Sequence, residues 1–325
     1  MNFIKAHIDK VVLAMVILLI LGILSAYINL GAVSVVASVV LPILFLLNII
    51  VACYAVLKKK YRYLIGLIAF LFCFKFFFQW STESEHTEAT LSLLTYNVKA
   101  FADEDQQVAN NIIKFIDSIN PDILLLQEST YKVGRRISGF NYHFLGFREG
   151  VEKTLLDIYS KFPIVNKGFV DFPESKNNSI YADLKVKNDT LRIYNIHLQS
   201  FAFTSSNADG VTVKASKTLS KQIEQASLIK AHTKQSKHKV IVSGDLNATQ
   251  FTKPYRIISE ELNDSFFKKG RYLGTTYSLK GYPLRLDYAL VDKSLSIHKH
   301  ENIELNLSDH QPLLIKFSIP KISRS

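Results

Sequence analysis

Hydrophobic positions are concentrated in the first 80 residues, where three apolar stretches are separated only by short polar breaks. Each stretch has close to the roughly 20 residues with which a helix crosses a bilayer. We therefore expect three transmembrane helices at about residues 11–30, 33–57 and 61–80.

Two other interpretations of this region remain open. It could form a buried helical hairpin in a soluble protein, although its length and its few polar side chains favour membrane helices. Lys5 and Lys10 before the first stretch also resemble the start of a cleaved signal peptide. Because no clear small-x-small cleavage site follows and two more apolar stretches come directly after, three retained helices are the preferred interpretation.

The orientation of these helices follows from the basic residues. Residues 58–62, between the second and third stretches, contain four Lys or Arg, and the positive-inside rule puts such a cluster in the cytoplasm. The N-terminus is then cytoplasmic, and the polar, acidic linker at 81–89 lies outside. We expect a multi-pass cell-membrane protein that contacts the lipid bilayer through residues 1–80 and carries the rest of the chain outside the cytoplasm.

Beyond the linker, the pattern changes to that of a mixed α and β domain at residues 90–320. Short apolar runs separated by Gly, Pro or Asn predict strands, and apolar residues at helical spacing predict two helices. The strands are expected at 90–99, 122–128, 140–147, 154–160, 164–171, 179–186, 190–197, 240–247, 285–291 and 312–319, and the helices at 103–120 and 214–238. The mostly polar segment 201–213 is expected to be a loop, either solvated or facing a substrate.

Polar residues repeatedly stand where these strands end. Side chains two positions apart on a strand share a face, so Asp245 and Asn247 can converge on one ligand, and Gly244 lets the backbone come close to it. A strand, a helix and a strand with short links form a βαβ-like unit, so Asn97 and Glu128 should emerge at the same edge of a sheet. Further polar positions of this kind are His197, Asp287, Asp309 and His310. The sequence thus predicts one polar cluster at the end of the strands.

Charge and cysteine content narrow the function. The formal net charge of the chain is +11, of which residues 1–80 hold +6, so the domain carries a modest +5 without a basic stripe interleaved with aromatic residues. Nucleic acid is therefore not favoured as a partner on charge alone. Both cysteines, Cys53 and Cys73, fall in the predicted membrane helices, so the domain uses neither a disulfide nor a thiolate site. No obligate protein partner is evident.

The motifs and their order resemble the endonuclease/exonuclease/phosphatase superfamily, which has the deoxyribonuclease I-like fold. The resemblance spans roughly residues 90–320 and rests on Tyr96-Asn97, Leu126-Gln127-Glu128, the segment 159–164, His197, Gly244-Asp245-Leu246-Asn247, Arg285-Leu286-Asp287-Tyr288 and Ser308-Asp309-His310. It implies an α/β (α+β) four-layer sandwich, with two face-to-face β-sheets flanked by helices. Preceded by three transmembrane helices, the chain is identified as a membrane-anchored bacterial member.

The resemblance also implies roles for single residues. Glu128 would be the main ligand of a divalent metal, Mg²⁺ or Mn²⁺, and Asn97 and Asp309 would complete or support the metal site. Asp245 would orient or deprotonate the attacking water, and Asn247 would hold a phosphate oxygen.

Two histidines complete the implied site. His310, oriented by Asp287, has the titration range for general acid and base work. His197 would donate to the phosphate or the leaving group. Lys99 departs from the pattern, because the abasic-site repair nucleases of the superfamily carry an acid there, which argues against DNA repair.

These implications lead to one expected function with two alternatives. We expect a membrane-anchored, divalent-metal-dependent phosphodiesterase that acts outside the cytoplasm by in-line attack of water. Its phosphate-ester substrate would be a lipid head group, a small phosphodiester or nucleic acid. The alternatives are a non-specific extracytoplasmic endonuclease or exonuclease, and a binding domain on the same fold without catalysis.

Overall fold

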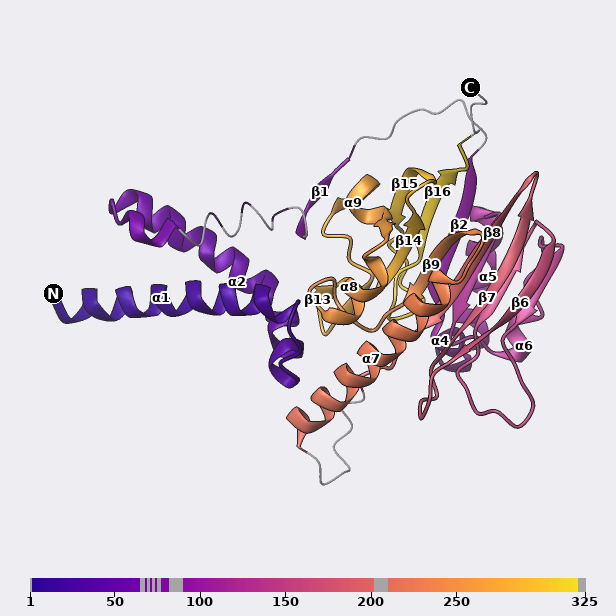
Figure 1. Cartoon of the computed structure of the whole chain (residues 1–325), viewed down its shortest axis with the longest axis horizontal. Coiled ribbons are helices and arrows are strands. Elements are labelled where there is room, and N and C mark those ends of the chain that lie inside the picture. The colour runs from indigo at the N-terminus through magenta and orange to yellow at the C-terminus, as the bar shows by residue number, and fades with distance from the viewer. Residues whose placement is uncertain are drawn as a thin grey trace.

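The computed structural model describes residues 2–64, 68, 71, 74, 77–81, 90–201 and 210–320. Two β-sheets with flanking helices form most of the molecule, and a pair of long N-terminal helices projects from one side of them (Figure 1).

The first large sheet has the strand order β15-β16-β2-β3-β5-β4. Its strands are β2 (Leu91–Asn97), β3 (Ile123–Gln127), β4 (Tyr142–Leu145), β5 (Asp157–Ser160), β15 (Ser296–Asn302) and β16 (Leu313–Ser318). β2 and β3 run parallel, and the other neighbours in this sheet are antiparallel.

The second large sheet has the order β10-β14-β9-β8-β7-β6. Its strands are β6 (Ile164–Asp171), β7 (Asn178–Val186), β8 (Asp189–His197), β9 (Lys239–Asp245), β10 (Leu262–Asp264) and β14 (Asp287–Asp292). The parallel pair here is β8 and β9. Each sheet is therefore mixed and has one parallel pair at its centre.

Successive side chains along each strand face opposite sides of the sheet, and this alternation builds a layered core. In β2, Leu93 points into the core between the two sheets, and its neighbour Leu94 packs on the outer face against helix α5 (Gln106–Ile119). In the second sheet, Val242 packs outward beneath helices α7 (Val211–Lys234) and α8 (Lys253–Ser259). The period of two that the sequence shows thus produces the four layers of helix, sheet, sheet and helix.

Short elements connect these layers. They are η1 (Tyr61–Leu64), β1 (Gln79–Trp80), α4 (Lys99–Glu104), α6 (Tyr131–Gly134), α9 (Ser265–Lys269), β11 (Arg271–Tyr272), β12 (Tyr277–Leu279) and β13 (Tyr282–Leu284). β12 and β13 pair as a hairpin, and β1 pairs with β11, which attaches the segment before the linker to the sandwich.

The N-terminal helices α1 (Asn2–Ser25) and α2 (Ala32–Leu57) lie against each other. Asp9 near the start of α1 pairs with Lys60 just after α2 at 2.5 Å, so the two helices form an antiparallel hairpin. In Figure 1 the far end of this hairpin points away from the sheets, and its turn lies next to the sandwich.

The three expected membrane helices are only partly matched. Among the residues that the structure describes, one helix, α2, is long and apolar enough to cross a membrane, and 39% of its most apolar window is buried in the protein. The helix expected at 11–30 instead begins at Asn2 and ends at Ser25, because residues 26–31 turn toward the sandwich. Of the span expected at 61–80, nine residues lie outside the described part, its first four residues form η1, and its last two form the strand β1.

Two helix boundaries also differ from expectation. The helix expected at 103–120 begins only at Gln106, because the Asp105 carboxylate caps it by accepting from the backbone amides of Gln107 and Val108. The preceding residues 99–104 form a separate turn with φ between 44° and 66°, the left-handed region. The helix expected at 214–238 runs from Val211 to Lys234, and residues 202–209 of the expected loop lie outside the described part.

Candidate active site

The first sheet brings Asn97 and Glu128 together at one edge. Asn97 ends β2 and is in register with Gln127, which ends the parallel strand β3, and Glu128 follows directly. The Asn97 Nδ2 atom donates to Glu128 Oε1 at 3.0 Å, and Asn97 Oδ1 accepts from the backbone amide of Lys99. The sequence-based prediction that Asn97 and Glu128 share an edge is therefore confirmed.

The second sheet aligns three titratable side chains on neighbouring strands. His197 on β8 and Asp287 on β14 are both in register with Asp245 on β9 between them. Gly244 makes this spacing possible, because a Cβ atom there would lie 2.2 Å from the carbonyl oxygen of Ile196 on β8. The close approach expected at Gly244 thus concerns the neighbouring strand.

The two edges meet across the sandwich. Asn97 Nδ2 also donates to Asp245 Oδ2 at 3.1 Å, which joins the first sheet to the second. His197 Nε2 lies 3.5 Å from Glu128 Oε1 and 3.6 Å from Asp245 Oδ2. One polar cluster is formed, as expected, from both sheets.

His310 enters this cluster from the loop before β16 and is held by Asp287. Its Nδ1 atom lies 2.8 Å from Asp287 Oδ2, and its Nε2 atom lies 3.6 Å from Asp245 Oδ2. Burial disfavours the imidazolium, but the carboxylates of Asp287 and Asp245 outweigh burial and raise the pKa of His310 to about 10. The side chain is therefore an imidazolium over the neutral pH range.

The other two buried groups have different charge states. Burial lowers the pKa of His197 to about 4, against the opposing effect of Glu128, so this imidazole is neutral at pH 7. Neither of its ring nitrogens has a hydrogen-bond partner among the described residues. Burial raises the pKa of Asp245 to about 7, although His310 works against this shift. The site thus combines a neutral histidine, His197, a carboxyl group that titrates near pH 7, Asp245, and an imidazolium, His310.

Asn247 reaches the site in a way that the strand pattern did not predict. The strand ends at Asp245, whose carboxylate accepts from the Asn247 backbone amide at 2.7 Å, and Asn247 has a φ of 48°. Its Nδ2 atom donates to the carbonyl oxygen of Leu198 at 3.0 Å. Asp245 and Asn247 still line one pocket, but through an Asx turn and not through strand periodicity.

Asp309 lies at the exposed rim of the same pocket. Its carboxylate is 3.4 Å from Lys99 Nζ, and both side chains are about two fifths exposed. The Asp309 charge raises the pKa of Lys99. The hydroxyl of Ser308 donates to the carbonyl oxygen of Asn97 and so ties this loop to β2. Lys99 is therefore an ion-pair partner at the rim.

Two kinds of group could hold a metal ion. Within the described residues, Asp245, Asp287 and His310 have ligand atoms within 4.8 Å of one another. The hydrogen bond between His310 and Asp287 already occupies part of that set. Glu128 fits a hard cation better, since its carboxylate is about one third exposed to the cleft and faces the Asn97 amide and the His197 ring. Asn97 turns its nitrogen toward Glu128, so as oriented here it supports the carboxylate.

Two residues at the site, Asn195 and Tyr277, were not identified from the sequence. Gln127 Nε2 donates to Asn195 Oδ1 at 2.7 Å, and Asn195 Nδ2 donates to the Leu126 carbonyl oxygen, so this pair joins the two sheets beneath the cluster. Tyr277 places its ring 4.8 Å from that of His310. A single Asn or Tyr in a strand does not predict a hydrogen bond or a ring contact of this kind, because the partner comes from a distant segment of the chain.

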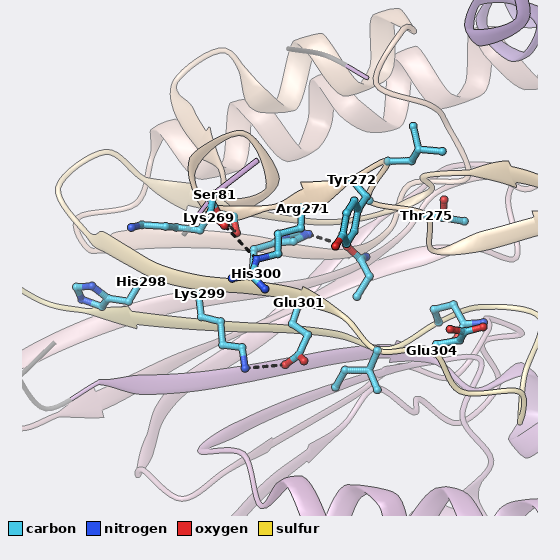
Figure 2. Close-up of a pocket in the computed structure, with 15 residues that line it drawn as sticks. Ser81, Lys269, Arg271, Tyr272, Thr275, His298, Lys299, His300, Glu301 and Glu304 are labelled. Carbon is cyan, nitrogen blue, oxygen red and sulfur yellow. Dashed lines mark hydrogen bonds and ion pairs between the residues drawn. The ribbon is translucent and has the colours of Figure 1, made fainter. Parts of the chain in front are cut away.

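A second pocket, of about 510 Å³, lies away from this cluster and is drawn in Figure 2. Three of its charged side chains are engaged: Arg271 donates to the Ser81 carbonyl oxygen, and Lys299 pairs with Glu301 at 2.9 Å. It does not include the side chains of the candidate active site.

The two-sheet sandwich thus gathers carboxylates, an amide and a carboxylate-bound histidine at one edge, which are the kinds of group that phosphoester hydrolysis requires. The model of the Endonuclease/Exonuclease/phosphatase family matches residues 94–310, and the chain belongs to this family. Comparison with curated proteins finds no match.

Solved structures share the fold. An endonuclease/exonuclease/phosphatase family protein from Bacteroides thetaiotaomicron is 18% identical, with a TM-score of 0.58, over 73% of this chain and 100% of its own. A humanized TDP2 of D. rerio is 17% identical, with a TM-score of 0.56, over 70% of this chain and 99% of its own. The mannosyl-6-phosphatase Bt3783 of B. thetaiotaomicron is 17% identical, with a TM-score of 0.55, over 70% and 99%.

Proposed function

We propose that the protein is a membrane-anchored, divalent-metal-dependent phosphoester hydrolase that acts outside the cytoplasm. The observation that carries this proposal is the convergence of Asn97 and Glu128 from one sheet with His197 and Asp245 from the other, within 3.0 to 3.6 Å. Such a set combines a hard metal ligand, a base for water and hydrogen-bond donors for phosphate, which phosphoester hydrolysis needs in one place.

The chain's own residues have distinct tasks in this proposal. Asp245 orients the attacking water and accepts its proton as the water oxygen bonds to phosphorus. The His310 imidazolium, held by Asp287, stabilises charge on the phosphoryl oxygens. Neutral His197 donates an N–H to a phosphate oxygen or to the oxygen that leaves, and Asn247 positions the phosphate.

Glu128, with Asn97 and Asp309 in support, would hold the divalent metal, proposed to be Mg²⁺ or Mn²⁺. When bound, this ion supplies positive charge next to the phosphoryl oxygens. The hard oxygen donors of these side chains support Mg²⁺ over softer metals.

Membrane anchoring rests on the apolar surface of the N-terminal hairpin. α1 and α2 expose Leu21, Ile43, Leu46 and Ile50 by 43% to 64%, and large exposed apolar side chains gathered on two paired helices are typical of a membrane or partner contact. The basic residues at 58–62 support a cytoplasmic position for the far end of α2, and hence an outer position for the sandwich. The proposed topology has three spans with the N-terminus inside.

The relatives differ in substrate. One solved TDP2 structure holds a single-strand DNA product, and Bt3783 is named a mannosyl-6-phosphatase. A nuclease therefore remains the alternative for this chain, and the assay must separate it from hydrolysis of small esters and lipids.

The test uses the full-length protein in nanodiscs with Mg²⁺, bis(p-nitrophenyl) phosphate, plasmid DNA and phospholipid as substrates. We expect chelator-sensitive hydrolysis of at least one substrate, with losses of at least about 100-fold in Glu128→Ala and His310→Ala. The matched controls are Glu261→Ala and His238→Ala, whose side chains are 60% and 36% exposed and lie outside the site. Full activity in either site variant refutes the assignment. A reporter fused at Ser325 that works only in the cytoplasm refutes the topology.

A further inference from the structure

The N-terminal part of helix α2 forms one wall of the candidate active site. The pocket that contains Glu128, Asp245 and His310 has a volume of about 280 Å³, and Val35, Ser38 and Val39 of α2 line it. These three residues are spaced as neighbours on one face of a helix. Val36, on another face of the same turn, is 59% exposed. The helix expected to cross the bilayer thus turns one face to the catalytic groups and another outward.

Specific contacts hold α2 in this position. The Tyr282 hydroxyl on β13 donates to the carbonyl oxygen of Val39 at 2.7 Å, and Ser216 Oγ on α7 accepts from the backbone amide of Ala32 at 2.8 Å. At Gly31, just before the helix, an added Cβ would lie 2.7 Å from Ser216 Oγ. The backbone of α2 therefore lies in direct contact with α7 and β13, and α2 is a fixed part of the pocket wall in the folded protein.

The same pocket has a second apolar wall from the β12–β13 hairpin and the segment after it. Leu279, Leu284 and Leu286 line it there. Leu284 and Leu286 are 8% and 9% exposed, so they form a packed surface beside the catalytic groups. An alkyl chain between these leucines and the valines of α2 would lose its contact with water, which is the main source of apolar affinity.

On its other side, the site continues into a basic groove. Glu128 and Ser200 line both the pocket beside α2 and a neighbouring pocket that contains His197. The second pocket is lined by Glu174 and by lysines from the loop before β7 and from the first half of α7: Lys176, Lys214, Lys217 and Lys221. Lys176 pairs with Glu152, and Lys221 donates to the Glu174 carbonyl oxygen at 2.6 Å, so the lysines outnumber the acid in the groove. The groove therefore suits a polar or anionic group, opposite in character to the wall built by α2.

We propose that the enzyme takes its substrate from the bilayer, and that this substrate is an amphiphilic phosphoester with its apolar chain between α2 and the β12–β13 hairpin. The phosphate lies at Glu128 and His310, and the head group extends into the groove of lysines. This inference rests on the proposed phosphoester hydrolase function and specifies its substrate class. A soluble nucleotide or a sugar phosphate would leave the apolar walls without a partner.

The test measures how affinity depends on chain length. Full-length protein in nanodiscs is titrated with butyl phosphate and octyl phosphate, each below its micelle concentration, by isothermal titration calorimetry. The two probes share a phosphate and differ only in the alkyl chain. If the chain is buried at the wall, octyl phosphate binds at least about tenfold tighter, since every buried methylene adds to the affinity.

Variants assign the effect to the wall. Val39→Trp fills the pocket and is expected to bring the octyl-to-butyl affinity ratio close to one. Val36→Trp is the matched control on the outward face of the same helix and is expected to keep the wild-type ratio. Because both variants carry the same nanodisc lipid, partitioning of octyl phosphate into the bilayer affects them equally. Leu279→Trp repeats the test from the opposite wall if Val39→Trp does not fold.

The inference is overturned by equal affinities for the two probes in the wild type, by equal ratios in Val39→Trp and Val36→Trp, or by an oligonucleotide that binds more tightly than octyl phosphate. The titrations are run without divalent metal, so the readout is binding and is independent of turnover. Loss of chain-length discrimination with metal-dependent hydrolysis intact would refute only the substrate class, whereas hydrolysis that survives Glu128→Ala would refute the catalytic assignment.

Discussion

Arg285 is predicted to stabilise the active-site edge of the second sheet through a buried ion pair. Its Nη1 and Nη2 atoms donate to the two oxygens of Asp264 at 3.0 and 2.9 Å, and the two side chains are 1% and 2% exposed. The Tyr255 hydroxyl adds a third donor to Asp264 at 2.7 Å. The guanidinium lies 4.5 Å from the ring centroids of Phe266 and Tyr288. Arg285 stands two residues before Asp287, so this pair anchors the start of β14.

The expected loss in Arg285→Met is large because Asp264 would keep its charge without its partner. Removing one member of a buried pair costs about 3–5 kcal/mol. For a domain of this size, about 1 kcal/mol lowers Tm by roughly 2–4 °C, so we expect a drop of roughly 6–20 °C. Arg285→Lys should fall in between, since a lysine cannot bind both carboxylate oxygens in a fork. Replacing both partners by apolar residues should recover part of the loss.

Thermal unfolding of the full-length protein in nanodiscs, followed by circular dichroism at fixed protein and lipid concentrations, measures these shifts. Arg271→Met, at an exposed arginine on β11, is the control and should change Tm little. A drop in Arg285→Met no larger than that of the control would refute the reasoning. So would a double variant with Asp264→Leu that is less stable than the single variant, because the cost is assigned to the uncompensated carboxylate.

Three further outcomes follow from the described structure. Burial lowers the pKa of His300 to about 4 from its usual 6.5. The stability that this group contributes is therefore present above pH 6.5 and is lost as the pH falls toward 4, by about 3 kcal/mol. When unfolding is measured at several pH values, His300→Leu should lose less stability between pH 6.5 and pH 4 than the wild type. Gly244→Ala should lower both Tm and activity, because the new methyl meets the Ile196 carbonyl oxygen, whereas Gly210→Ala, which has open space around it and no left-handed φ, should keep the activity. Direct calorimetric titration with Mg²⁺ should show binding that is lost in Glu128→Ala, and unchanged binding would exclude Glu128 as the main ligand.

The sheet edges could be predicted from the sequence because they depend on local periodicity. Asn97 and Glu128 follow two parallel strands joined by a short helical connection, and this connectivity alone sends both to one edge. The position of Asp245 follows in the same way from the apolar run that precedes it. What local periodicity could not supply was the meeting of the two edges, since Asn97 and Asp245 are 148 residues apart in the chain.

Other details depend on single backbone angles or on distant partners. Asn247 leaves the strand because its backbone amide binds the Asp245 carboxylate. The sequence-based prediction assumed that the strand continues through Asn247. Residues 99–104 take left-handed angles although none of them is Gly or Asn, which no propensity predicts. The Gln127 to Asn195 hydrogen bond requires two sheets to be packed before it exists.

The hydropathy pattern of α2 predicts the helix correctly but does not predict that the helix lines a pocket. An apolar stretch at 33–57 predicts a helix of that length, and the helix runs from Ala32 to Leu57. Hydropathy treats all its faces alike, and so Val35 and Val39 look the same as Val36. The difference arises only because Ser216 and Tyr282, more than 180 residues further along the chain, hold the start of α2 against the sandwich. Helix α2, which the sequence predicts only as a membrane span, thereby lines the pocket of Glu128, Asp245 and His310, and the affinity of that pocket for its ligand is expected to fall when that contact is broken.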